Sequence, residues 1–191
     1  MVSSREVPAE FVADFVNTRA DGAGHLELFG SAEDLRAWGV HRQVLAGTAP
    51  VTQSDLVAAR ELREALRTLL LVHAQAPELP AAQREAAHDY LRQAAIRYPL
   101  VADITADRAR LLGQASGVPG LLGHVLAAVI EAQQHGEWQL VKACCSPVCQ
   151  FAFVDRTRNH SGRFCSPRCA SRVSMHASRE RRRQTAPVGP E

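Results

Sequence analysis

Two close pairs of cysteines constrain this chain more than any other feature of its sequence. The first pair begins at Cys144 or Cys145 and ends at Cys149, and the second pair, Cys165 and Cys169, begins after fifteen further residues. Two short cysteine loops at this separation are typical of two chain turns that hold one tetrahedral metal ion. The spacing therefore predicts one Zn²⁺ ion, with a structural role because four thiolates leave no open position for water.

Two disulfides and a catalytic thiol are the alternatives to a zinc site. Disulfides are disfavoured because the start of the chain lacks the pattern of a secretory signal, so we expect a cytoplasmic, reducing location. A catalytic thiol needs a base, and no arrangement of a cysteine with a histidine is identifiable. His160 and His176 are reserve ligands for the metal if one of the cysteines does not bind it. A segment of about 40 residues buries too little surface to fold unaided, whereas structural zinc supplies on the order of 10 to 16 kcal/mol.

The residues around the cysteines predict a small treble-clef-like zinc finger. Residues 151–155 alternate as a strand does, residues 156–162 are rich in turn formers, and residues 163–165 supply a return strand. Ser166 and Pro167 suit the start of a helix that continues until about residue 185. The prediction is a β hairpin followed by a helix that carries the last ligand.

The first 137 residues predict a mainly α domain with one small β hairpin. Ser31 and Thr52 suit helix N-caps, Gly39 is expected to end the first of these helices, and Pro99 closes a third. The apolar periodicity predicts a short helix at 31–39, a long helix that begins at residue 52, and two further helices at 80–97 and 119–135. Residues 100–105 and 108–113 are expected to pair as a hairpin. We expect domains at 1–137 and 138–184 and a disordered tail at 185–191. No apolar run reaches the length needed to span a membrane.

The charge of the chain is divided unevenly. Residues 1–143 carry a net charge of −4 and residues 144–191 carry +6, while four zinc-bound thiolates would offset about two of those positive charges. Along the predicted last helix, Arg172, His176, Arg179 and Arg183 share one face. The other candidate nucleic-acid contacts lie in or beside the turn of the predicted hairpin: Arg156, Arg158 and Arg163.

This basic end predicts an acidic partner, and double-stranded DNA is the first candidate because guanidinium groups bind phosphate oxygens and guanine edges. A merely solvated helix is the plain alternative. RNA is a second candidate, since the phenylalanines of the finger could stack on bases if they were exposed. A protein-interaction adaptor that docks an acidic partner is a third.

The run Asn17, Thr18 and Arg19 follows an apolar segment that begins at Phe11. These side chains satisfy local backbone groups at the end of a helix or strand, or they line a small-molecule cleft. We predict no enzyme, because the sequence contains no paired carboxylates in a recognisable setting, no glycine-rich phosphate loop and no triad motif.

The run from Trp138 to Cys144, together with the later cysteines, Asp155 and residues 169–172, resembles the CGNR zinc-finger family. Residues 11–19 resemble the start of the ABATE domain that precedes this finger. The resemblance implies Cys144 as the first ligand, with Cys145 left over. It also implies a mainly helical N-terminal domain and a transcription regulator of the stress-response kind, which we expect to be bacterial. Apart from the resemblance, a small-molecule effector in the candidate cleft and a homodimer, the commonest state of bacterial regulators that read paired half-sites, are further candidate partners.

One part of the family pattern is absent. The tetrad that names the family reads Cys169, Ala170, Ser171 and Arg172 in this chain, so its glycine and asparagine are replaced. The zinc prediction does not depend on those two positions. The resemblance therefore does not supply the role that the family assigns to the asparagine, although Ser171 could still donate one hydrogen bond.

Overall fold

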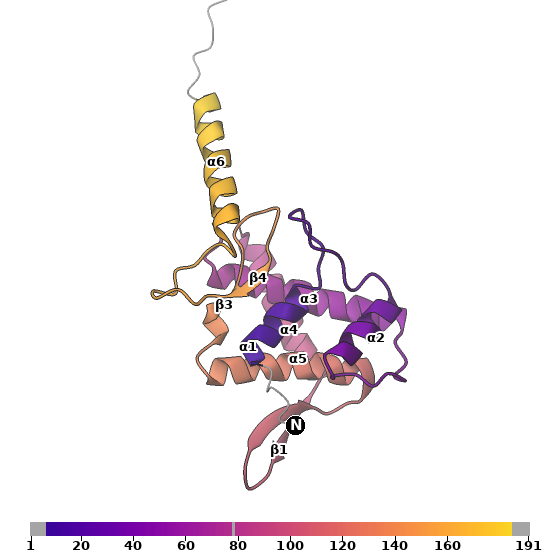
Figure 1. Cartoon of the computed structure of the whole chain (residues 1–191). Coiled ribbons are helices and arrows are strands. Elements are labelled where there is room, and N and C mark those ends of the chain that lie inside the picture. The colour runs from indigo at the N-terminus through magenta and orange to yellow at the C-terminus, as the bar shows by residue number, and fades with distance from the viewer. Residues whose placement is uncertain (1–6, 78, 185–191) are drawn as a thin grey trace, which may run out of the picture.

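The computed structural model describes residues 7–77 and 79–184, and the tail predicted at 185–191 lies outside them. The described residues form a mainly α fold with two antiparallel hairpins (Figure 1), which confirms the predicted fold class. The helices are α1 (Pro8–Val16), α2 (Ala32–His41), α3 (Gln53–His73), α4 (Ala81–Arg97), α5 (Gly117–Gln134) and α6 (Pro167–Gln184), with a 3-10 turn, η1 (Trp138–Leu140). The strands are β1 (Leu100–Ile104), β2 (Ala109–Gly113), β3 (Val141–Ala143) and β4 (Ala152–Val154).

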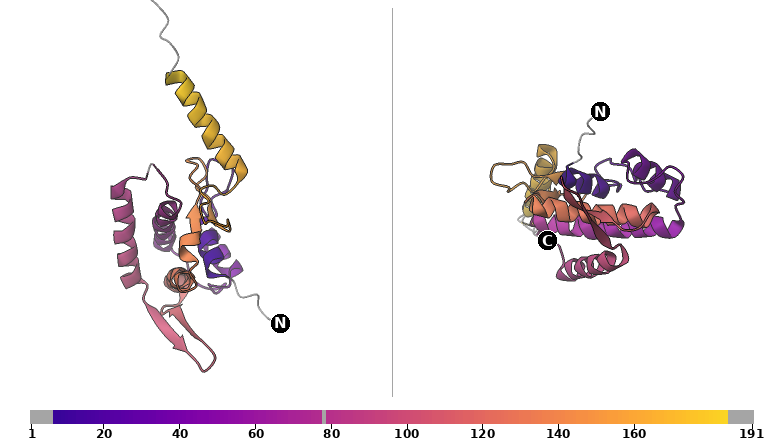
Figure 2. Two further views of the ribbon diagram at one scale, coloured as in Figure 1. Left: turned by 90° about the vertical axis from the view of Figure 1, so that its left-hand side faces the viewer. Right: turned by 90° about the horizontal axis from the view of Figure 1, so that it is seen from below.

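Helices α3 and α5 lie side by side, with α1 and α2 on one side and α4 on the other (Figure 2). The start of α3 follows from its sequence, because the Thr52 hydroxyl accepts from the Asp55 amide and the Asp55 carboxylate accepts from the Thr52 amide. Ser31 caps α2 in the predicted way. The apolar stripe of α3 faces the core, as its three- and four-residue periodicity predicts.

Gly39 does not end α2, and that expectation was wrong. The helix continues past this residue to His41. The absence of a side chain at Gly39 is instead required by packing. A Cβ atom at this position would lie 2.8 Å from side-chain atoms of both Leu121 and Leu45. The missing side chain therefore lets α2 approach α5 and the loop that follows α2.

The predicted hairpin is confirmed as β1 and β2, which pair from Leu100 opposite Gly113 to Ile104 opposite Ala109. It projects from the helical body below α5 (Figure 1). The base of the hairpin touches the first turns of α5 through glycines, since a Cβ atom at Gly113 would lie 2.6 Å from the Gly120 carbonyl oxygen. This close approach fixes the angle at which the hairpin leaves the body.

Gly113→Ala is expected to destabilise the fold by about 1 to 3 kcal/mol, because the new methyl group clashes with backbone that cannot move independently. Gly47→Ala is the matched control, since a Cβ atom there meets nothing within 4 Å. Urea denaturation of the two variants tests this expectation. Equal stabilities of the two variants would show that the hairpin is not held by this contact.

The hairpin of the finger differs from the predicted one. Strand β4 pairs with β3, with Lys142 opposite Phe153, so the two strands flank the first cysteine pair. Residues 163–165 form no strand, and one bond from the Cys145 amide to the Arg163 carbonyl oxygen, at 2.8 Å, joins them to the first cysteine loop. The prediction missed β3 because it is three residues long and fully buried, so it shows no alternation.

Both finger strands belong to the same hydrophobic core as the helices. Val141, Ala143 and Ala152 are buried in one cluster with residues of α1, α3 and α5. Helix α6 instead leaves the body and projects away from it (Figure 1). Within the described residues, no helix combines the length and the apolar character needed to cross a membrane.

Candidate metal centre and basic helix

The sulfur atoms of Cys144, Cys149, Cys165 and Cys169 all lie within 4.8 Å of one another. The Cys149 and Cys165 sulfurs are 3.6 Å apart, and those of Cys165 and Cys169 are 3.8 Å apart. A tetrahedral Zn²⁺ ion with Zn–S distances of about 2.3 Å has sulfur atoms separated by about 3.8 Å. The four residues therefore fit one structural Zn²⁺ ion, with all four positions taken by sulfur.

Each sulfur is positioned by a different local structure. Cys144 directly follows β3, and Cys149 ends a tight turn in which its amide donates to the Ser146 carbonyl oxygen at 2.9 Å. Cys165 lies in the loop before α6. Cys169 lies in the first turn of α6, where its amide donates to the Ser166 hydroxyl at 3.3 Å, which is the predicted cap.

The four clustered cysteines can all be ionised only if a cation lies among them. Burial, with the neighbouring thiol groups, raises the pKa of Cys149 well above its usual range and that of Cys165 to about 11. Burial also opposes ionisation of Cys169, but hydrogen bonds from Ser166 and the neighbouring sulfurs outweigh it and lower the pKa of that thiol. Four buried thiolates repel one another, and a divalent ion supplies the missing positive charge.

Cys145 lies outside this group, as the resemblance implies. Its thiol lies 3.4 Å from the Ala74 carbonyl oxygen and donates to it. Burial raises the pKa of Cys145, so the thiol stays protonated and unreactive. The reserve ligands His160 and His176 are not part of the sulfur group. The His176 ring pairs instead with Glu180.

A buried ion pair supports the loop between the two cysteine pairs. The Lys142 ammonium, 5% exposed, lies 2.7 Å from the carboxylate of Asp155, which is 2% exposed. That carboxylate also accepts from the Thr157 amide and hydroxyl and from the Gly162 amide. Together these bonds lower the pKa of Asp155 against the opposing effect of burial. The sequence signal was present but unused, since Lys142 is the one lysine of the chain.

Asn17 holds strand β4 to helix α1. Its side-chain amide donates to the Ala152 carbonyl oxygen at 3.0 Å, and its oxygen accepts from the Ala152 amide at 2.7 Å. Asn17 thus pairs with Ala152 as a neighbouring strand would. It also borders a depression of about 280 Å³ that Glu10 and Arg156 flank.

Thr18 and Arg19 do not line that depression. Thr18 is fully buried, and its hydroxyl donates to the Phe15 carbonyl oxygen at 2.8 Å and accepts from Arg63. Arg19 pairs with Glu64 at 3.3 Å. The small-molecule cleft at Asn17, Thr18 and Arg19 stays a prediction. The bond from Thr18 to Phe15 is a local contact with the backbone, which is the alternative role expected for these side chains.

Further bonds join the finger to α1, to α3 and to the loop after α3. The His73 ring lies 2.9 Å from the Val141 carbonyl oxygen, and the Arg67 guanidinium donates to the Gln150 side-chain oxygen at 2.7 Å. Arg163 donates to the Gln75 carbonyl oxygen at 3.3 Å, and Arg156 pairs with Glu10 of α1. These contacts between distant segments have no signal in a single sequence.

Protonation of His73 is expected to weaken the fold in mild acid. Burial lowers the pKa of His73 below 6.5, so the folded chain binds fewer protons than the unfolded chain. The free energy of unfolding is therefore highest above pH 6.5 and decreases as the pH falls below it. Chemical denaturation of wild type and His73→Gln between about pH 5.5 and 8 measures this, and parallel curves would contradict the assignment.

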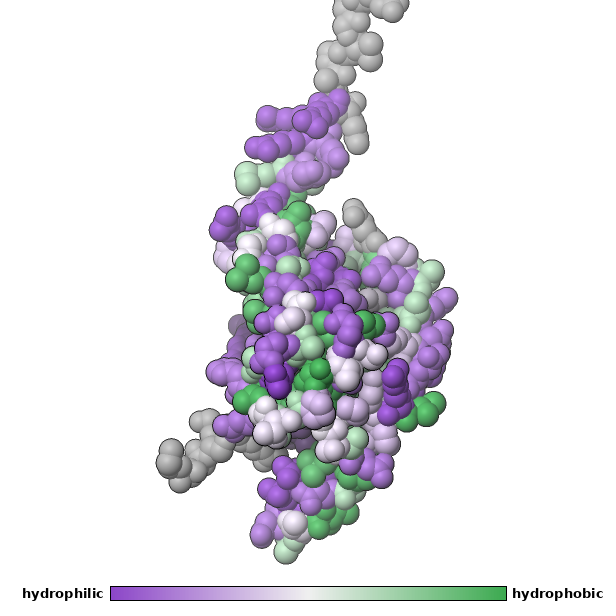
Figure 3. Space-filling model, turned by 90° about the vertical axis from the view of Figure 1, so that its right-hand side faces the viewer, coloured by the Kyte–Doolittle hydropathy of each residue, from purple (hydrophilic) through white to green (hydrophobic). Residues whose placement is uncertain are grey.

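The basic side chains of the last helix lie on an extended, solvated element. His176, Arg179 and Arg183 are exposed, and Arg172 is half-buried. Hydrophilic side chains cover most of α6 (Figure 3). Arg158 is exposed in the loop before Cys165. The sequence interpretation did not name three further arginines of α6, namely Arg168, Arg181 and Arg182.

Two family models match the chain. A model named ABATE, described as "Putative stress-induced transcription regulator", matches residues 9–133. A model described as CGNR zinc finger matches residues 141–182, which contain β3, β4, the four sulfur ligands and most of α6. A search of curated proteins finds no match.

Proposed function

The chain belongs to the ABATE family and carries a CGNR zinc finger, and from this premise we propose that it is a bacterial, cytoplasmic transcription regulator that binds double-stranded DNA through the finger. Residues 138–184 are the proposed DNA-binding part. Residues 1–137 are the proposed sensing or dimerising part. We assign no catalytic role to either.

The observation that carries the proposal is the placement of α6. The helix carries the metal ligand Cys169 in its first turn and extends away from the helical body, so an arginine-rich face is held at a fixed point by the zinc site (Figure 1). An α-helix of this kind fits the major groove of B-form DNA, where arginine reads guanine edges and phosphates. The loop arginines Arg156, Arg158 and Arg163 belong to the same finger.

The phenylalanines of the finger favour DNA over single-stranded RNA. Phe151, Phe153 and Phe164 pack against the buried cysteines and are half-buried themselves. Stacking on RNA bases needs exposed aromatic faces. These three rings serve instead as the core of the finger.

Salt-dependent DNA binding tests the proposal. Genomic binding-site selection with zinc-loaded protein, followed by titration of the selected duplex, should give an affinity that falls with salt at a slope of about −3.6 if about four phosphates are contacted. Affinity that ignores salt, or no binding at about 50 mM salt, would overturn the proposal. Capture of one acidic protein without nucleic acid would favour the adaptor alternative.

Arg179→Gln with Arg183→Gln is the matching variant. Loss of two phosphate contacts should weaken DNA binding at least tenfold and reduce the salt slope by about 1.8, while zinc content stays unchanged. Arg84→Gln with Arg92→Gln is the control, since both positions are exposed on α4 and are not part of the finger. Equal losses in the two double variants would show a general charge effect.

A further inference from the structure

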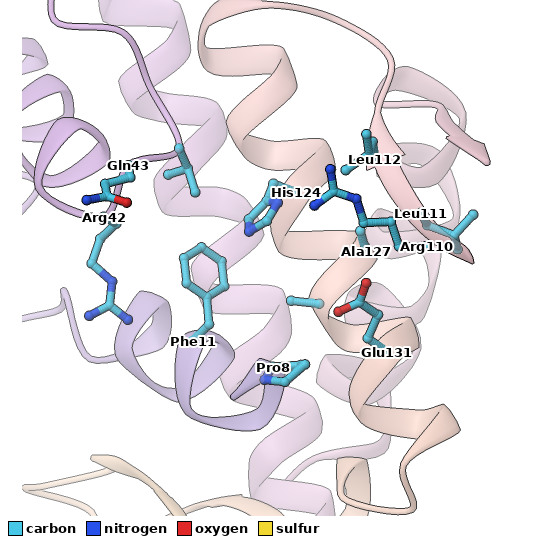
Figure 4. A pocket seen from close by; sticks show the side chains of 12 residues that line it. Pro8, Phe11, Arg42, Gln43, Arg110, Leu111, Leu112, His124, Ala127 and Glu131 are labelled. Atoms are coloured by element: carbon cyan, nitrogen blue, oxygen red, sulfur yellow. The ribbon is translucent and has the colours of Figure 1, made fainter. Parts of the chain in front are cut away.

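A cavity of about 330 Å³ lies in the helical body, and none of its lining residues belongs to the finger. Its walls come from the start of α1, the loop after α2, strand β2 and the middle of α5 (Figure 4). This volume falls within the range of small-molecule sites. The cavity is separate from the metal centre and from the depression beside Asn17.

One side of the cavity is apolar. The Phe11 ring meets the His124 ring edge-on, with centroids 4.9 Å apart and planes at 84°. Leu112 and Ala127 extend this lining. The Arg42 guanidinium, which also lines the cavity, lies 5.6 Å from the Phe11 ring centroid and pairs with Asp14 at 2.8 Å. The Phe11 ring is therefore held in place with its edge at the cavity.

The polar side chains of the cavity carry both signs of charge. The Arg110 guanidinium and the Glu131 carboxylate extend into the same hollow, beside His124 (Figure 4). Both charges act on His124, since Glu131 raises and Arg110 lowers its pKa. Burial is the largest effect and lowers that pKa, so the ring is neutral at neutral pH and offers one hydrogen-bond donor and one acceptor.

Most of this hydrogen-bonding capacity is unused. Within residues 7–77 and 79–184, neither the Glu131 carboxylate nor the His124 ring makes a hydrogen bond or an ion pair, although both residues are half-buried. Arg110 uses only its Nε, which donates to Asp103 at 3.0 Å. Half-buried polar groups that converge on a cavity without partners in the protein are typical of a ligand site.

We propose that this cavity binds a small amphoteric molecule of the class of apolar or aromatic α-amino acids. Its carboxylate pairs with the Arg110 Nη groups, its ammonium pairs with Glu131, and its side chain packs against Phe11. A simple anion would leave Glu131 unpaired beside it, and a simple cation would leave the Arg110 Nη groups without a partner, since only the Nε of Arg110 bonds to Asp103, so a molecule with both charges fits best. The proposal is independent of DNA binding.

Three related probes test the ligand class with the zinc-loaded full chain. L-phenylalanine carries both charges, 3-phenylpropanoate carries only the carboxylate, and phenethylamine carries only the ammonium. Ligand-observed NMR titration should show saturable binding, with L-phenylalanine at least tenfold tighter than either of the others. No saturable binding, or a one-charge probe that binds as tightly as L-phenylalanine, would overturn the proposal.

Single substitutions then assign the two charges. Glu131→Gln should weaken binding of L-phenylalanine about tenfold, and Arg110→Gln should do the same. The exposed Glu85→Gln and Arg84→Gln on α4 are the charge-matched controls and should leave the affinity unchanged. Because Glu131 is half-buried and Arg110 exposed, a thermal melt should show each variant folded. Unchanged affinity in both cavity variants would place the ligand elsewhere.

Discussion

Removal of the zinc ion is expected to unfold the helices of this protein together with the finger. Cys144 directly follows β3, and Val141 and Ala143 of that strand are buried among α1, α3 and α5. Structural zinc contributes about 10 to 16 kcal/mol, while a whole protein of this kind is stable by only about 5 to 15 kcal/mol. Loss of the metal should therefore destabilise the core that the finger shares with the helices.

Thermal denaturation followed by far-ultraviolet circular dichroism measures this effect, because the signal reports the helices. Chelator-treated protein and the Cys165→Ser variant should each melt at least about 10 °C below the zinc-loaded wild type, or without a cooperative transition. Cys145→Ser is the control, since its sulfur lies outside the metal group. It should keep both the zinc content and the melting temperature.

An unchanged melting temperature without zinc would contradict this expectation. If metal-free protein keeps the helical transition at its original temperature, residues 1–137 fold independently of the finger. The boundary expected from the sequence would then be a true domain boundary. The shared core and the bonds of Asn17 to Ala152 lead us to expect a single transition instead.

Lys142→Met is expected to cost about 3 to 5 kcal/mol, because it leaves the Asp155 carboxylate buried without its cation. Methionine is unbranched and only one atom shorter than lysine, so the loss of charge is the main change. Asp155→Asn in the same chain should recover part of that stability, because it removes the unpaired charge while the one amide oxygen of asparagine can still accept from Thr157. Urea denaturation of the zinc-loaded wild type, the Lys142→Met variant and the double variant measures these differences in the free energy of unfolding.

Arg92→Met is the control for the buried pair. It breaks the ion pair with Asp89 on the exposed face of α4, where both side chains are largely in water. Such pairs contribute at most about 1 kcal/mol. If Lys142→Met cost no more than Arg92→Met, the pair of Lys142 and Asp155 would have no special role in the finger.

The zinc site and most helices could be predicted from the sequence because their signals are local. The cysteine spacing sets how two short loops meet one ion, and Thr52 and Ser31 mark helix starts within their own turns. The β1 and β2 hairpin is local in the same sense, since its strands are separated by four residues.

Contacts between distant segments were decided only by the tertiary structure. Strand β4 pairs with β3 rather than with residues 163–165 because burying Val141 and Ala152 among the helices outweighs a local return strand. Asn17 was a candidate for a cleft, and the fold uses its amide to hold Ala152, 135 residues away.

The cavity beside Phe11 is built from four segments that no spacing rule connects. The sequence by itself therefore determined the metal and the local elements. The arrangement of these elements around one core was decided by long-range packing, which depends on the shape of the whole chain.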